Sequence, residues 1–437
     1  MLEYTVPNSI EHDGHTWELP INWEVLTNKW YGKNRTIRMK VSTDLAWWME
    51  RSIPWGTLKA NAYFVMNPNG LIKKLGGNPK AFCRSGYREQ GLTCVADCIN
   101  PIYLDTNWVT VKAKACAKAG QSYQWNWDNW YVARAWWDIQ NKIFTDNVQA
   151  NRIVTSKVTS MFQLFQNRAD FNQDISNWDT SNVTDMRWLF LGAKSFNQPI
   201  GNWDTSKITD MTNMFNWATS FNQDISNWNT SNVTNMSLMF ADATSFNQPL
   251  DNWDTSKVTN MWWMFLRAEK FNQPLNNWNT SNVTDMNTMF WSATSFNQPL
   301  NNWNTSKVTN MGAMFSRATS FNQDIWNWNT SKVTNMKAMF SWAVLFNQNI
   351  SNWDTSKVTN MYSMFGWATS FNQPLNNWNT SKVTDMGGMF FWSKLFNQPL
   401  NNWDTSNVTN MKWMFDWATS FNHSYAPFYN FSTSNKK

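Results

Sequence analysis

The sequence predicts an α/β repeat solenoid with one short helix and one short parallel strand in each 25-residue coil, preceded by a small mixed or β N-terminal region. The first observation behind this prediction is a pattern that recurs every 25 residues from residue 158 to residue 423, without an insertion or a deletion. The second and third are the spacings of apolar residues within one unit, which fit first a helix and then an extended segment. No unit has enough apolar residues to fold alone, so neighbouring units must bury one another.

The helix is predicted from the segment that follows V-T in each unit. In V-T-D-M-T-N-M-F-N-W-A, the residues Met211, Met214, Phe215 and Ala218 stand at positions i, i+3, i+4 and i+7. This spacing places four apolar side chains on one face of a helix, where they can pack against the core of the array.

The strand is predicted between the periodic Phe and the Ile or Leu four residues later, for example between Phe221 and Ile225. About half of the units carry Pro here, which removes a backbone donor and is tolerated in an edge strand. Stacked in parallel at ~4.8 Å per coil, the units would form a rod of roughly 50 Å. Asn222 and Gln223 would lie above their copies in neighbouring coils and form a ladder of side-chain amides.

The remainder of the chain divides by composition. Residues 1–78 have no period, and their apolar patches and turns predict a small domain of unknown type. Residues 79–100 form a cysteine-containing loop module. Residues 101–150 are expected to hold short strands and a helical stretch at 138–144, and to cap the array of residues 151–423. Residues 424–437 are expected to form a C-terminal cap and a polar tail.

All four cysteines lie close together, at Cys83, Cys94, Cys98 and Cys116. An even number of cysteines in a loop-rich stretch predicts two disulfides and an oxidising compartment, although their connectivity does not follow from the spacing. A structural zinc site is the alternative, but the spacing lacks the two close pairs that are typical of zinc ligands.

The repeats do not indicate catalysis. The chain has three histidines and none lies inside the regular array, so no triad or repeated acid–base pair can be composed there. We therefore expect a protein without enzymatic activity, catalytic residues or a cofactor. His12, Asp13 and His15 could hold a metal, but an isolated H-x-x-H pattern is weak evidence for one.

The charge and hydropathy of the chain exclude two classes of partner. The net charge of +6 is a mild excess, and the lysines of the repeats do not cluster, which argues against nucleic acid. No stretch reaches the ~20 apolar residues of a membrane-spanning helix. The first residues carry no export signal, so if the protein is exported we expect the signal upstream of this sequence or on an alternative start.

The unit F-N-Q-D-I-S-N-W-D-T-S-N-V-T-D-M at Phe171 to Met186 closely resembles the repeats of bacterial BspA-like leucine-rich-repeat surface proteins, also catalogued as a domain of unknown function common in mycoplasmas. The resemblance recurs in eleven units. It implies an extracellular, non-enzymatic array for adhesion or partner binding, and it supplies neither a partner nor ligand-binding residues. We expect a monomeric rod, on the cell surface or secreted, whose exposed face contacts a protein or glycan of another cell or of the matrix.

Eleven tryptophans of the repeats lie outside the periodic Trp position, and several stand where another unit has Gly. Trp217, Trp342 and Trp367 align with Gly192, directly after the expected helix, where Gly is favoured because it accepts a positive φ. Our hypothesis is that many of these tryptophans are Gly in the organism, encoded by UGA codons. UGG codons at these positions would contradict it.

Two alternative functions follow from other readings of the same residues. If the additional tryptophans are genuine, they would line the array as an aromatic ladder, and the protein would be a carbohydrate-binding module. Alternatively, the repeats would be the targeting arm of a hydrolase in residues 1–150, which would need a cleft with converging carboxylates.

Overall fold

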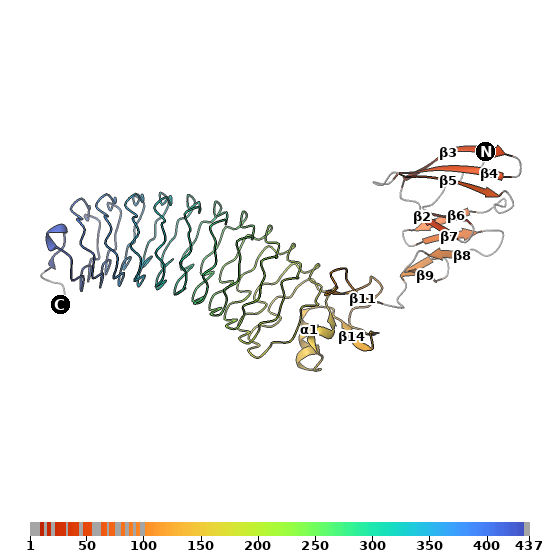
Figure 1. Cartoon of the computed structure of the whole chain (residues 1–437), viewed down its shortest axis with the longest axis horizontal. Coiled ribbons are helices and arrows are strands. Elements are labelled where there is room, and N and C mark those ends of the chain that lie inside the picture. The colour runs from red at the N-terminus through yellow and green to blue at the C-terminus, as the bar shows by residue number, and fades with distance from the viewer. Residues whose placement is uncertain are drawn as a thin grey trace. The chain divides into compact units, whose positions relative to one another are not determined.

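The computed structural model describes residues 101–431 in full and, within residues 1–100, the backbone of ten strands. The chain forms two compact units, residues 1–103 with 113–118 and residues 104–112 with 119–437. Figure 1 labels the main elements of both units.

The first unit consists of antiparallel sheets. Strands pair as β1–β2, β3–β4–β5, β6–β7–β8 and β9–β10, and β1 and β2 form a hairpin closed by His12 and His15. The strands are β1 (Ser9–His12), β2 (His15–Glu18), β3 (Asn22–Tyr31), β4 (Asn34–Ser42), β5 (Trp47–Pro54), β6 (Tyr63–Asn67), β7 (Gly70–Lys74), β8 (Lys80–Cys83), β9 (Tyr87–Gln90) and β10 (Thr93–Ala96).

The segment before the repeats contains short strands and one helix, α1 (Trp136–Phe144). Its strands are β11 (Ile102–Leu104), β12 (Val111–Ala113), β13 (Ser122–Trp125), β14 (Asp128–Val132) and, after the short helix η2 (Ala150–Arg152), β15 (Ile153–Val154). Strand β14 pairs antiparallel with β13 and parallel with β15, which leads into the first coil. The ring of Phe144 lies 6.3 Å from that of Phe165 and 6.1 Å from that of Phe171, so α1 packs against the end of the core.

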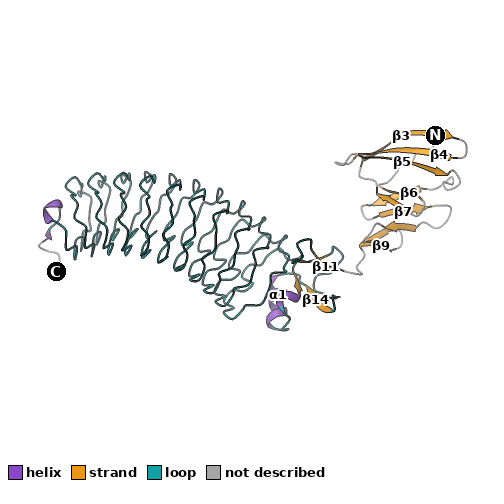
Figure 2. Ribbon diagram, in the orientation of Figure 1, coloured by secondary structure: helices purple, strands orange, loops and turns teal. Residues whose placement is uncertain are grey.

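The repeats stack in register, one 25-residue coil after another, but the coils contain neither the predicted helix nor the predicted strand. Figure 2 shows them drawn as loops between α1 and the C-terminal end. Isolated parallel bridges, such as Asn235 with Asn260 and Asn310 with Asn335, join successive coils. The one-helix, one-strand description of the coil was therefore wrong.

Two left-handed residues per coil explain why no helix forms. The Met214 amide donates to the Met211 carbonyl (3.2 Å) and the Ala218 amide to the Phe215 carbonyl (3.0 Å), so each segment is a four-residue turn. The third residue of each turn, Asn213 or Trp217, has a φ of 57° or 61°, as in a type II turn. Two successive four-residue turns bury residues at i, i+3, i+4 and i+7, which is the spacing that had indicated a helix.

Amides that the turns leave free bind the neighbouring coil. Asn213, Phe215 and Trp217 donate to the carbonyls of Ser237 (3.1 Å), Met239 (2.9 Å) and Ala241 (2.8 Å). This alternation is the pattern of a parallel ladder, formed here by a chain of turns. It fixes the backbone through hydrogen bonds that do not depend on the side chains.

The core consists of continuous aromatic columns, which confirms the prediction that neighbouring units bury one another. From Phe171 to Phe421 the rings of equivalent residues lie 5.7–6.1 Å apart. A second column, from Phe165 to Phe415, has ring spacings of 5.5–5.8 Å. In the column of periodic tryptophans, neighbouring rings lie 6.2–6.5 Å apart and nearly parallel.

Polar side chains next to the core are paired across coils. Asn222 donates its backbone amide to Asn197 Oδ1 (2.9 Å), and Gln223 Nε2 donates to the same oxygen (3.0 Å). The predicted amide ladder is thus confirmed, and it joins side chains to backbone as well as to one another. Each periodic Trp donates its indole N–H to a carbonyl of the preceding coil, as Trp228 does to Ile200 (3.0 Å).

The last coil is covered by residues after the repeats. Phe428 stacks on Trp403 with ring centroids 6.3 Å apart, and Phe431 stacks on His423 at 3.9 Å. The short helix η3 (His423–Tyr425) turns the chain back over the core. These rings shield aromatic columns that would otherwise end in solvent.

Candidate functional site

Four positions of the coil vary from unit to unit while the rest of the pattern stays nearly constant. They are residues 162, 163, 166 and 167 of the first coil and the equivalent residues every 25 positions along the chain. Across eleven coils these positions hold nine, eight, nine and six different residue types. We call the surface that they form the variable face.

Solvent exposure alone does not explain this variation. Thr184 and its equivalents are exposed, yet this position is Thr in all eleven coils, because its hydroxyl donates to the Thr159 carbonyl of the preceding coil (3.2 Å). The variable positions belong to the two turns whose backbone is fixed by the inter-coil ladder. At the third position, equivalent to Gln166, the residue is buried in seven of the eleven coils. The other three positions are mostly exposed or half-buried, and their side chains can fit a partner.

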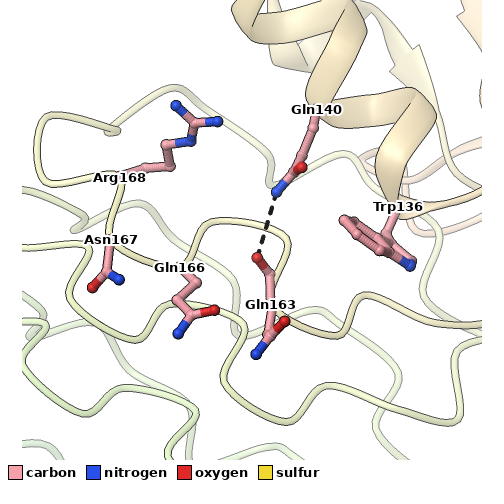
Figure 3. A pocket seen from close by; sticks show the side chains of 6 residues that line it. All are labelled: Trp136, Gln140, Gln163, Gln166, Asn167 and Arg168. Carbon is pink, nitrogen blue, oxygen red and sulfur yellow. Dashed lines mark hydrogen bonds between the residues drawn. The ribbon is translucent and has the colours of Figure 1, made fainter.

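The variable face begins at a polar hollow of about 380 Å³ between α1 and the first coils (Figure 3). Gln140 Nε2 donates to the Leu164 carbonyl (2.7 Å) and lies 3.5 Å from the Gln163 carbonyl, which ties α1 to the first turn. The hollow offers amides, one guanidinium and one indole to a ligand, from Trp136, Gln140, Gln163, Gln166, Asn167 and Arg168.

A second hollow of about 450 Å³ continues the first, since the two share Asn167. Its lining residues are Asn167, Ala169, Leu191, Gly192, Lys194 and Trp217. Neither lining contains a carboxylate, a thiol or an imidazole, so the two hollows can bind a polar ligand but have no acid–base pair.

Cations on the variable face are only partly neutralised. Arg187 forms an ion pair with Asp185 (2.9 Å), and Arg267 with Asp242 (2.6 Å). In contrast, no ion pair among the described residues involves Arg317 or Lys337 of the face, or Lys394, which lies beside the face two residues after Trp392. These three lie over the aromatic rings of Trp342, Tyr362 and Trp392, at 5.1, 5.4 and 5.2 Å from the ring centroids. The C-terminal half of the face therefore presents positive charge beside aromatic rings.

The Arg187–Asp185 pair perturbs both of its members. Burial acts to raise the pKa of Asp185, but hydrogen bonds from Arg187 and its charge outweigh burial and lower that pKa. The same hydrogen bond, followed by the charge of Asp185, raises the pKa of Arg187. Because both charges are satisfied locally, this pair orders its turn and is a weaker contact for a ligand than the unpaired cations.

Four tryptophans at the last variable position form a stacked column. The ring centroids of Trp342, Trp367, Trp392 and Trp417 lie 4.2, 4.4 and 4.9 Å apart in succession. A sugar ring stacks on the open face of an aromatic side chain. Here the rings cover one another's faces and Arg317 lies over the first ring, so the column presents mostly ring edges. This geometry disfavours a carbohydrate ladder.

The cap before the repeats contains a cluster of buried titratable groups. Tyr131 donates its hydroxyl to Asp138 (2.8 Å), and Arg134 Nη2 lies 3.0 Å from the same carboxylate. Burial, and then the hydrogen bond to Asp138, raise the pKa of Tyr131 to about 12. Burial acts to raise the pKa of Asp138, but hydrogen bonds from Arg134 and Tyr131 outweigh it and lower that pKa. The cluster is fully hydrogen-bonded and holds α1 on the cap.

The predicted cysteine and metal sites lie mostly outside the described residues. Cys116 is disulfide-bonded, whereas the side chains of Cys83, Cys94 and Cys98 are outside the described part, so the pairing stays a prediction. The side chains of His12 and His15, and all of Asp13, are likewise outside it. Among the residues whose side chains are described, no group of three or more His, Cys, Asp or Glu is placed to hold a metal.

The comparisons place the repeats in a known family. The family model described as Mycoplasma protein of unknown function, DUF285, matches residues 137–253, 221–328 and 318–428, from α1 to beyond the last coil. Comparison with curated proteins and with solved structures finds no match. Among the residues that the structure describes, no helix has the length and apolar character needed to cross a membrane.

Proposed function

Because the chain belongs to this Mycoplasma family of tandem repeats, we propose that its coils form a leucine-rich-repeat-like solenoid whose variable face binds a protein partner. The observation that carries the proposal is the concentration of unit-to-unit variation at four neighbouring positions on a backbone that does not change. A surface that varies while its scaffold stays constant is the usual arrangement of repeat proteins that bind partners.

Charge complementarity favours an acidic partner surface. Among the described residues, positive charge without an ion pair is offered by Arg317 and Lys337 on the face and by Lys394 beside it. Equivalent contacts along several coils would add as avidity, so each contact can be weak. In this proposal the protein acts as a monomeric, non-catalytic adhesion or interaction protein.

We further propose that the protein works outside the cell, on the surface or secreted. The disulfide of Cys116 supports an oxidising compartment. The hydrolase alternative depends on residues 1–150, whose first hundred residues have no described side chains, and nothing in residues 101–150 favours it.

The test is binding of the full chain to poly-L-glutamate as an acidic polypeptide probe, with a charge-reversed variable face. The variant Arg317→Glu/Lys337→Glu/Lys394→Glu should weaken binding by about tenfold or more, since exposed ion pairs contribute roughly 0.2–1 kcal/mol each. The matched control is Lys207→Glu/Lys257→Glu/Lys307→Glu, whose lysines contact Asn182, Asn232 and Asn282 away from the variable face.

Equal losses in the two triple variants would contradict the proposal, because net charge alone would then explain binding. Sulfated and uronic-acid glycans tested beside the polypeptide separate the two partner classes. Binding to glycans without binding to poly-L-glutamate would replace the protein partner with a carbohydrate.

A further inference from the structure

The second and fourth variable positions are left-handed in every coil. Their φ angles lie between 51° and 71° in all eleven coils, from Gln163 and Asn167 in the first to Trp413 and Trp417 in the last. The two turns of each coil require this conformation, because it belongs to the third residue of a type II turn.

The residues found at these 22 sites do not follow the physical preference for this conformation. Glycine adopts positive φ without strain, whereas other residues place their Cβ too close to the following carbonyl. Yet Trp occupies eight of the 22 sites and Gly only two, Gly192 and Gly388. A bulky aromatic residue is thus four times as frequent as the residue best suited to the site.

Two turns outside the repeats show the same anomaly. Strands β13 and β14 are joined by Asn126 and Trp127, with φ of 51° and 67°. Two positive φ angles in a two-residue hairpin loop define a type I′ turn, for which Asn-Gly is strongly preferred. Trp127 is 99% exposed, and Trp108, with a φ of 59°, is 82% exposed, so neither indole is buried in a core that would offset the strain.

The ten periodic tryptophans contrast with these in every respect. None of them has a positive φ among the described residues, and they are only 1–5% exposed. Each donates its indole N–H to a backbone carbonyl of the preceding coil at 2.8–3.2 Å. These residues are required as Trp by their burial and their hydrogen bonds.

We infer that the left-handed tryptophans are glycine in the protein as the organism makes it, and that the periodic tryptophans are Trp. The inference covers Trp108, Trp127, Trp188, Trp217, Trp263, Trp342, Trp367, Trp392, Trp413 and Trp417. It accounts for the residue frequencies if UGA codons are read as Gly. Trp262, Trp291 and Trp326 also align with Gly in other coils but have no positive φ, so the backbone does not assign them.

With Gly at these positions, the variable face loses its exposed indole side chains, and the fold keeps its hydrogen bonds between coils. The backbone amide of Trp217 donates to the Ala241 carbonyl (2.8 Å), and Gly keeps that bond. With Gly at the last variable position of four successive coils, the stacked column from Trp342 to Trp417 is replaced by a flat strip of backbone. The cations Arg317, Lys337 and Lys394 remain, so the proposed function and this inference are independent of each other.

Peptide mass spectrometry of the protein purified from its source organism tests the inference directly. We expect peptides with Gly at positions 217, 342 and 367 and with Trp at the periodic positions 228, 353 and 378. The coding DNA should have UGA at the first set and UGG at the second. Trp at positions 217, 342 and 367 in the native peptides would overturn it.

A stability comparison on the recombinant chain tests the physical premise. Trp342→Gly should unfold at a higher temperature than Trp342→Ala, because both remove the indole and only Gly accepts the left-handed backbone without strain. The matched control is Trp353→Gly, at a periodic position, which should lower the melting temperature strongly. A lower melting temperature for Trp342→Gly than for Trp342→Ala would refute the premise.

Discussion

The amide ladder can be tested by removing one of its steps. Asn247 Oδ1 accepts the backbone amide of Asn272 (2.9 Å) and the Nε2 of Gln273 (3.0 Å). Replacing Asn247 with Ala removes this acceptor but keeps the Asn247 amide, which still donates to Asn222 Oδ1 (2.9 Å). The substitution therefore cuts the ladder between two coils and leaves the steps on either side in place.

The expected loss follows from what each donor retains. The partly buried Asn272 amide would have no acceptor, which costs about 1–3 kcal/mol for a buried donor. Gln273 Nε2 keeps a second acceptor in the Asn247 carbonyl (3.1 Å), so its loss adds only about 0.5 kcal/mol. We expect Asn247→Ala to reduce the free energy of unfolding by about 2–3 kcal/mol.

Urea unfolding followed by circular dichroism measures this loss, and hydrogen exchange at the Asn272 amide locates it. The control is Asn247→Asp, which keeps an oxygen acceptor at the same place and should lose less than about 1 kcal/mol. If Ala and Asp variants were equally stable, or if the Asn272 amide kept its protection in the Ala variant, the ladder would not contribute as argued.

Three further predictions concern the core, the acidic turns and the cap. Phe290 is fully buried between Phe265 and Phe315, so Phe290→Ala should lower the free energy of unfolding by about 3–5 kcal/mol in urea titration. Leu345 is 53% exposed, and Leu345→Ala should change that free energy by less than about 0.5 kcal/mol. Hydrogen bonds from Ser256 and Ser356 lower the pKa of Asp254 and Asp354 from the ordinary value of 3.8. A carboxylate whose pKa is lowered in the folded state stabilises the fold above its unfolded pKa, so this contribution is lost as the pH falls below about 3.8. The melting temperature of the Asp254→Asn/Asp354→Asn variant should therefore fall less steeply with decreasing pH than that of the unchanged protein. Asp138→Ala removes the shared acceptor of Tyr131 and Arg134 and should lower the free energy of unfolding by about 2–4 kcal/mol, which is measured as faster hydrogen exchange in α1. As a control, Asp146→Ala removes only an exposed ion pair with Lys142 and should lower that free energy by less than about 0.5 kcal/mol.

The period predicted the stacking correctly because equivalent residues of identical units must meet when the units pile up. The phenylalanine column and the ladder at Asn222 and Gln223 both follow from that rule alone. The helix prediction was wrong because burial at i, i+3, i+4 and i+7 does not distinguish a helix from two successive turns. The Gly at position 192 correctly indicated a positive φ, but it belongs to a turn and not to the end of a helix.

The variable face could have been predicted from the sequence but was missed, because the repeat was defined by the residues that recur and not by the positions that vary. Aligning the coils of the chain with one another would have identified positions 162, 163, 166 and 167 as a group. The hollow beside Trp136 could not be predicted from the sequence, since it depends on how α1 packs against the first coil. Its lining joins residues that no periodicity relates.

The ring spacings imply that each coil is a wedge. Equivalent rings are 5.5–5.8 Å apart in the phenylalanine column from Phe165 to Phe415, which belongs to the same two turns as the variable positions, and 6.2–6.5 Å apart in the column of periodic tryptophans. A stack of wedge-shaped coils curves into an arc, and the narrow edges of the coils lie on its concave side. The varied side chains therefore converge toward a common centre, so a rounded object can touch several coils at once where a flat sheet would meet only the two ends.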